Sequence, residues 1–174
     1  ALLYVEATLA NMIREGKLDS RVAAGSLTEE QKAVLREARN GLEQVKDAII
    51  AYVANQWDAQ ELNQVPRLLR SIAGSLGMIP LEAVSSLLNQ VAPFVEGLIN
   101  DNARIDWNTL DNFADVLSGI EYYIERYSEN PHNAGDSILE RASQALQSLP
   151  GYTPPVAVKP AEPEPTVVAE PEPV

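Results

Sequence analysis

The chain has 174 residues, no cysteine and a net charge of −12 at pH 7. This length suits one domain with a buried core, and the lack of cysteine excludes disulfides and thiolate metal sites. The acidity argues against binding to nucleic acid or anionic lipid. The sequence contains no run of about 18 apolar residues that could span a membrane. We expect a cytoplasmic protein.

Residues 1–149 have helical periodicity throughout and no convincing strand alternation. The first helix is expected over Ala1 to Glu15. The second opens near Thr28, because Thr28 and Gln31 can form a capping box. The third is expected over Asp58 to Gly77, where the glycine is a natural C-terminal stop.

Three further helices follow in the same part of the chain. The fourth comes after Pro80 and contains Pro93, which should bend it. Its apolar stripe is Leu81, Val84, Leu88, Val91, Val95 and Leu98. The fifth follows Asp106, and its apolar stripe is Trp107, Leu110, Ala114, Leu117, Ile120, Ile124 and Tyr127. The last runs from about Gly135 to Leu149. Because the connections are short, the pattern predicts an all-α, antiparallel, up-and-down bundle of about six helices.

The composition changes at Pro150, where proline and glutamate become frequent. Repeated proline removes backbone donors and favours extended conformations. We therefore divide the chain into a helical bundle over 1–149 and a disordered or extended interdomain linker over 150–174. The chain also begins without an initiator Met, inside an apolar-periodic segment, which suggests a fragment of a longer protein.

The third expected helix has an unusual outer face. Its apolar residues share one side, and Arg67 points in the opposite direction. The outward half also contains the candidate partner-binding residues Gln64, Arg70, Ser71 and Gly74. This face therefore combines two guanidinium groups with small residues and with a mid-helix glycine that lowers helix stability. Such a composition is unusual for a helix surface that has no binding role.

This helix resembles the phosphoacceptor helix of a histidine phosphotransfer (Hpt) domain. The Hpt pattern is a His, a basic residue three positions on, a Gly, a small residue, an aliphatic residue and a Gly. The corresponding positions here are Arg67, Arg70, Ser71, Ala73, Leu76 and Gly77. A guanidinium stays charged and cannot accept a phosphoryl group at physiological pH. Pro66 should also break or bend the helix, so we expect no phosphotransfer and no enzyme activity.

A wider set of residues resembles the Hpt-like modules of the chemosensory hybrid histidine kinase that controls type IV pili and twitching motility. The stand-alone pilus regulator FimL shares such a module. The set comprises Trp57-Asp58, Val65-Pro66, Leu68-Leu69, Gly74, Leu76, Met78, Ile120 to Glu125 and Ser137 to Glu140. The resemblance implies a docking or scaffold role for this module, with a response-regulator receiver domain or a pilus regulatory protein as partner. The linker favours the kinase as the parent protein.

Other interpretations remain open. The outer face could be a relic, and the bundle could be a spacer or a self-association module. His132, in an expected turn, could accept a phosphoryl group, although a solvated loop histidine is the simpler interpretation. With one histidine and no cysteine, we expect no metal site and no cofactor.

The aromatic residues are expected to pack in the core or at the bundle ends, and only Tyr122 is a candidate exposed contact.

Overall fold

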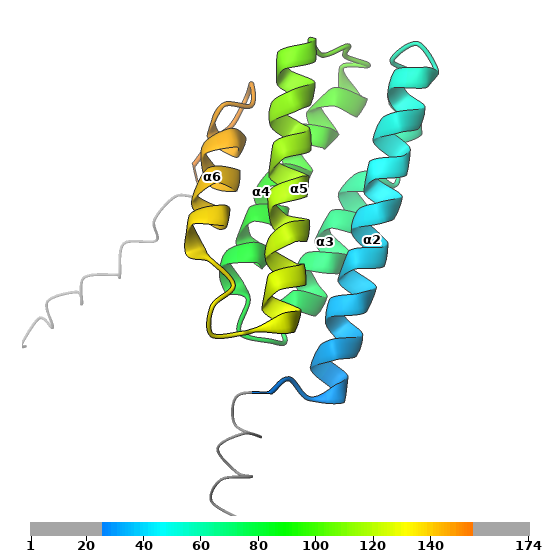
Figure 1. The fold of residues 1–174 in the computed structure, drawn as a ribbon. Coiled ribbons are helices and arrows are strands. Elements are labelled where there is room, and N and C mark those ends of the chain that lie inside the picture. Colours follow the sequence, from blue (N-terminus) through cyan, green and yellow to red (C-terminus); the bar gives the residue numbers. More distant parts are fainter. Residues whose placement is uncertain (1–25, 155–174) are drawn as a thin grey trace, which may run out of the picture.

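The computed structural model describes residues 26–154, which contain helices and no strand. The elements in chain order are α2 (Glu29–Ala54), the short 3₁₀ helix η1 (Ala59–Leu62), α3 (Val65–Leu76), α4 (Glu82–Asn100), α5 (Trp107–Glu129) and α6 (Asp136–Gln147). The all-α bundle is thus confirmed (Figure 1). The helix expected over Ala1 to Glu15 lies outside the described residues.

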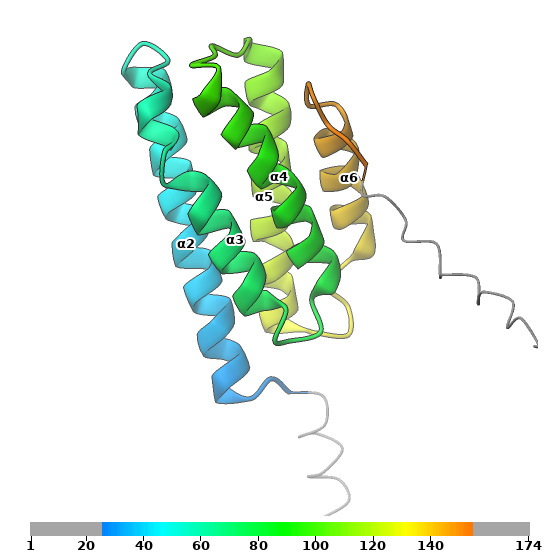
Figure 2. The ribbon, with the colours of Figure 1, turned by 180° about the vertical axis from the view of Figure 1, so that it is seen from behind.

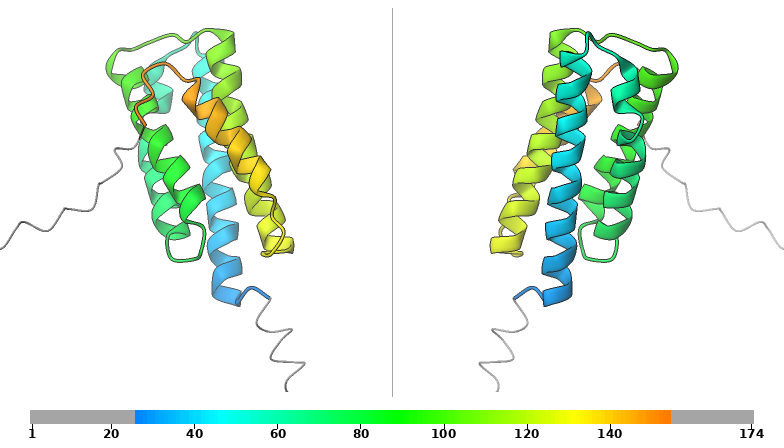
Figure 3. Two further views of the ribbon diagram at one scale, coloured as in Figure 1. Left: turned by 90° about the vertical axis from the view of Figure 1, so that its left-hand side faces the viewer. Right: turned by 90° about the vertical axis from the view of Figure 1, so that its right-hand side faces the viewer.

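The helices form a closed ring around one core. Helix α2 packs against α3 and α5, α3 packs against α4, and α6 joins α4 to α5. Figure 2 shows α3 and α4 running antiparallel on the side opposite to α5. In Figure 3 the α3–α4 pair and the α5–α6 pair stand on either side of α2. This arrangement leaves one long side of α3 facing solvent.

Two predicted helix starts are confirmed with their caps. Thr28 Oγ1 accepts a hydrogen bond from the Gln31 backbone N–H, and the Gln31 side chain accepts one from the Thr28 N–H, which completes the capping box. Asp106 Oδ1 accepts from the Thr109 N–H at 2.7 Å at the start of α5. These polar side chains satisfy backbone donors that the helices cannot satisfy themselves.

The continuous helix predicted over Asp58 to Gly77 is wrong. Asp58 caps only the 3₁₀ turn η1, and the α-helix begins again at Val65. The reason is Pro66, which has no N–H to donate to a carbonyl four residues earlier and is tolerated only in the first turn of a helix. The break that Pro66 predicted is therefore present, and it separates α3 from the preceding turn.

The core contains the predicted apolar stripes of α3 and α4. The stripe predicted at the start of α5 is only partly right, because Trp107 and Ala114 are exposed and Phe113 and Val116 are buried instead. At 3.6 residues per turn, Trp107 and Ala114 lie about 60 to 80° from the direction of Leu117, the centre of the buried side. Of the two places expected for Trp107, the core is excluded, and the ring packs at the bundle end against Trp57.

The last described residues stay attached to the bundle. The Tyr152 hydroxyl lies 3.0 Å from Gln90 Oε1 on α4 and donates a hydrogen bond to it. Tyr152 thus packs beyond the end of α6, two residues past the expected boundary at 150. Within residues 26–154, no helix is both long enough and apolar enough to cross a bilayer.

Candidate functional site

The candidate site is the outer side of α3, which we call the α3 face and define as Gln64, Arg67, Arg70, Ser71 and Gly74. All five residues are exposed, as the helical periodicity predicted. The opposite side of the helix is anchored in the core by Val65, Leu69, Ile72 and Leu76. Burial of that side fixes the rotation of α3, and therefore fixes which residues face solvent.

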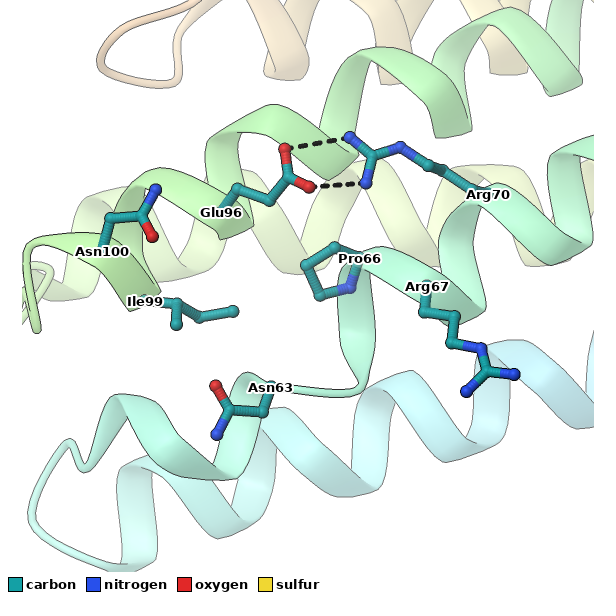
Figure 4. A pocket seen from close by; sticks show the side chains of 7 residues that line it. All are labelled: Asn63, Pro66, Arg67, Arg70, Glu96, Ile99 and Asn100. Atoms are coloured by element: carbon teal, nitrogen blue, oxygen red, sulfur yellow. Dashed lines mark hydrogen bonds and ion pairs between the residues drawn. The ribbon is translucent and has the colours of Figure 1, made fainter.

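Arg67 is the residue that the sequence resemblance aligns with the Hpt acceptor histidine. Its side chain is exposed and makes no hydrogen bond or ion pair with any residue in the 26–154 range. In Figure 4 it points away from the neighbouring Arg70 and Glu96. The guanidinium therefore retains all five donors for a group outside the described chain.

Arg70 differs from Arg67, because it is already paired. Its Nη1 and Nη2 donate to the two carboxylate oxygens of Glu96 on α4, at 2.5 and 2.9 Å (Figure 4). These hydrogen bonds hold the pKa of Glu96 below its usual range and raise that of Arg70. Both side chains are largely solvated, so the pair adds about 0 to 1 kcal/mol to stability. The face thus presents one free guanidinium, whereas the sequence suggested two.

A groove of about 480 Å³ lies beside this ion pair. It is lined by Asn63, Pro66, Arg67, Arg70, Glu96, Ile99 and Asn100, from the start of α3 and the end of α4. Pro66 and Ile99 supply apolar surface, and the other residues supply hydrogen-bonding groups. The one carboxylate that lines it, that of Glu96, is paired with Arg70, so the groove presents hydrogen-bonding and apolar groups.

Gly74 has no structural requirement among residues 26–154. A Cβ placed on it would meet no atom within 4 Å, although a glycine inside a helix is less stable than alanine by about 0.5 to 1 kcal/mol. Gly77, by contrast, is a helix end with ordinary φ of −66°, and its N–H donates to the Ala73 carbonyl. The open space above Gly74 is available to an external surface.

The surface that continues from Gly74 is depleted of charge. Between Arg70 and Glu96 the sequence has one charged residue, Glu82, although 22% of the chain is charged. The turn between α3 and α4 also exposes Met78, which is 83% accessible. Charge depletion and exposed Met are features of the central part of protein interfaces.

The other candidate residues from the sequence analysis lie outside the α3 face. His132 is exposed in the turn after α5, where its backbone N–H donates to Asn130 Oδ1. Tyr122 is 49% exposed, as predicted, but it lies on α5 beside Arg126. In the part of the chain that the structure describes, no cluster of His, Asp or Glu is arranged to hold a metal ion.

Sequence reasoning missed a cluster at one end of the bundle, where Trp57, Trp107 and Arg104 meet. Both tryptophans are expected from the sequence in the core or at the bundle ends, and nothing in the periodicity of α5 connects Trp107 with Trp57. The signal that could have found the cluster is the position of both tryptophans, each beside the end of a helix.

The fold is an all-helical bundle, and its α3 face exposes a guanidinium, Arg67, among small and polar residues. Comparison with known families is in agreement: the chain belongs to the FimL C-terminal domain family, whose model matches residues 25–146. The expected relationship to FimL is thereby confirmed.

Among curated proteins, the chain is similar to the scaffold protein FimL of Pseudomonas aeruginosa. The two are 27% identical over 162 residues, which cover 86% of this chain and 29% of the relative. The chain thus corresponds to less than a third of the length of that protein. No solved structure matches the chain.

Proposed function

We propose that the chain is a non-catalytic, Hpt-like docking or scaffold module in the signalling that controls type IV pili and twitching motility. Its proposed partner is a response-regulator receiver domain or a pilus regulatory protein in the cytoplasm. The family and the name of the relative, a scaffold protein, support the scaffold role. The observation that carries the proposal is the free, solvent-facing guanidinium of Arg67 where Hpt domains present an imidazole.

The chemistry of the α3 face favours binding over transfer. A guanidinium forms two parallel hydrogen bonds to a carboxylate, which positions an acidic partner residue with defined geometry. Gly74 and Ser71 lower the surface around Arg67, so a partner backbone can approach closely. The ion pair of Arg70 with Glu96 holds α3 and α4 together beneath the contact.

A phosphotransfer assay tests the absence of catalysis. The domain is incubated with a phosphorylated receiver and with the pilus kinase core, next to an active Hpt domain as positive control. We expect no acid-labile phosphate on this chain under conditions that label the control. Label on the chain would end the proposal, and loss of that label in His132→Gln would assign it to the turn histidine.

A binding assay tests the docking face. Arg67→Ala is compared with Arg141→Ala, which removes one positive charge from an exposed site on α6. Because both variants have the same net charge, a long-range electrostatic effect would change both affinities equally. We expect Arg67→Ala alone to weaken binding of the receiver or pilus regulator, with a smaller salt dependence. Equal affinities would favour a relic face and a spacer role.

The proposal also includes the division of the chain into a module over 1–149 and a linker over 150–174. The resemblance to the chemosensory kinase implies a kinase core elsewhere in the parent protein, whereas the matched relative is a scaffold protein. The segments that adjoin residues 1 and 174 in the complete gene decide between these parents. A kinase core or further Hpt modules would identify the kinase.

A further inference from the structure

A second surface lies at the end of the bundle where α2 ends and α5 begins, the upper end in Figure 1. We call it the aromatic end and define it as Tyr52, Trp57, Arg104 and Trp107. The Trp57 ring meets Tyr52 and Trp107 edge to face, each with centroids 5.2 Å apart. The Arg104 guanidinium lies over the Trp57 ring at 5.2 Å. Both tryptophans of the chain are in this cluster.

The backbone holds Trp57 in an unfavourable conformation to build this cluster. Gln56 and Trp57 have φ of 61° and 66°, in the left-handed region that side chains with a Cβ rarely adopt. This turn reverses the chain after α2 and places the Trp57 ring between Tyr52 and Trp107. Beneath it, the buried Tyr52 hydroxyl donates to the Ala103 carbonyl at 2.6 Å, which ties α2 to the segment before α5.

The outer member of the cluster is open to solvent. Trp107 is 62% exposed, although it is a large aromatic residue, while Trp57 is half-buried and already covered by Arg104. An indole ring attracts a cation to its face, and the Arg104–Trp57 contact shows that geometry within this cluster. Trp107 has no cation of its own among the described residues.

Near Trp107, carboxylates outnumber cations, and the one nearby guanidinium, that of Arg104, lies over Trp57. Asp106 precedes it, and the exposed Asp111 follows one turn later on α5. Asp58 caps η1 directly after Trp57. The pKa of Asp106 is lowered by its hydrogen bonds to Thr109, so its carboxylate is charged at neutral pH. An exposed tryptophan beside carboxylates is complementary to a cationic side chain, which can stack on the ring and pair with Asp111.

We propose that the aromatic end is a second docking site, which binds an arginine- or lysine-bearing segment of a protein partner over Trp107. This site is separate from the α3 face and does not depend on its function. The segment over 150–174 is a poor occupant, because it contains four glutamates and one lysine. A second copy is equally disfavoured, since each copy has a net charge of −12.

The probe is a short synthetic peptide of alternating arginine and glycine, with an alternating glutamate–glycine peptide as the charge control. Because Trp57 and Trp107 are both in the cluster, tryptophan emission of the wild-type chain reports occupancy of this end directly. At physiological salt we expect the arginine peptide to change the emission in a saturable way. The glutamate peptide should have no effect, and an unchanged emission with the arginine peptide would overturn the proposal.

Calorimetric titration of variants separates a site from general attraction. Trp107→Ala and Tyr122→Ala each remove an exposed aromatic side chain and leave the net charge unaltered. We expect Trp107→Ala to weaken arginine-peptide binding about fivefold, and Tyr122→Ala to leave it unchanged. Equal affinities of the two variants would mean non-specific attraction to an acidic protein and would refute the site.

A second pair of variants keeps the test valid if Trp107→Ala disturbs the fold. Asp111→Asn and Asp115→Asn each remove one exposed carboxylate, one turn apart on α5. A site over Trp107 predicts weaker peptide binding for Asp111→Asn than for Asp115→Asn. Equal weakening in both would again indicate only the overall charge. Neither variant touches the α3 face, so failure here leaves the docking role of that face unaffected.

Discussion

Two regions of the bundle contain mid-helix glycines for different reasons. At the α5–α6 contact, a Cβ on Gly119 would lie 3.1 Å from the Ala142 Cβ, and at the α2–α3 contact a Cβ on Gly41 would lie 2.7 Å from Ile72. On the α3 face, a Cβ on Gly74 would meet nothing. Glycine thus allows the helices to approach closely at both internal contacts, although the Ile72 side chain could move aside and the Ala142 Cβ could not.

The same fold does not require glycine at Gly74, where alanine would be more stable. A residue that lowers helix stability, with no reason among residues 26–154, is expected where a constraint acts from outside that part of the chain. Arg67 supports this interpretation, because it is also unpaired within the described residues. If the α3 face binds a partner as proposed, variants at the internal contacts should change stability, and variants of the face should change binding.

The largest expected effect is on the buried side of α3. Leu69→Ala should lower the free energy of unfolding by about 2 to 5 kcal/mol, because it leaves a cavity in a fully packed site. Arg67→Ala, on the opposite side of the same helix, should change it by less than about 0.5 kcal/mol. Chemical denaturation measures both. Comparable losses would mean that the α3 face contributes to the fold and is not reserved for a partner.

The next largest change in stability is expected from a leucine placed at an internal glycine, Gly119, compared with a leucine at the exposed Gly74. Gly119→Leu should destabilise the bundle by about 1 to 3 kcal/mol, since the Ala142 Cβ cannot rotate away. Gly74→Leu should leave thermal stability unchanged or raise it. Thermal denaturation followed by circular dichroism compares them. The contrast between the regions fails if Gly74→Leu unfolds as easily as Gly119→Leu.

Gly74→Ala should change the free energy of unfolding by less than Gly119→Leu does, and it should stabilise the bundle where Gly119→Leu destabilises it. Removing glycine's backbone entropy, with no contact to disturb, should raise the free energy of unfolding by about 0.5 to 1 kcal/mol. Urea denaturation of the variant and the wild type gives the difference. A loss of stability would reveal an internal role for Gly74.

The smallest effect concerns the ion pair beneath the α3 face. The Arg70 hydrogen bonds lower the pKa of Glu96 from its usual 4.5, so the stabilisation is present above that value and is lost as pH falls through the lowered pKa. The melting temperature of the wild type should exceed that of Glu96→Gln slightly at pH 7, and the difference should shrink as pH falls below 4.5. The control Glu140→Gln, an exposed glutamate without an ion pair in the described chain, should show no such convergence.

Much of this fold follows from the sequence. Side-chain caps at Thr28 and Asp106 and the apolar stripes of α3 and α4 are local signals, and each had its expected outcome. The break before Pro66 was visible in the sequence as well. The predicted helix nevertheless ran through it, because the caps at Asp58 and Gly77 suggested a single element.

The site was only half predictable, because partners across helices are not encoded in local periodicity. The outward direction of Arg67 follows from 3.6 residues per turn. The pairing of Arg70 with Glu96 depends on how α3 and α4 pack, and the sequence separation of 26 residues gave no signal for it. The edge-to-face contact of Trp57 with Trp107 depends likewise on a left-handed turn that sequence alone did not reveal.

Binding of the pilus receiver domains to Gly74→Leu and Gly97→Leu decides whether the α3 face is a docking surface. Both glycines are exposed inside helices with open space above them, but Gly97 lies on α4, away from Arg67. Isothermal titration should give wild-type affinity for Gly97→Leu and a strong loss for Gly74→Leu. Equal affinities of the two variants, or no binding of any receiver to the wild type, would contradict a receiver-docking role for this face.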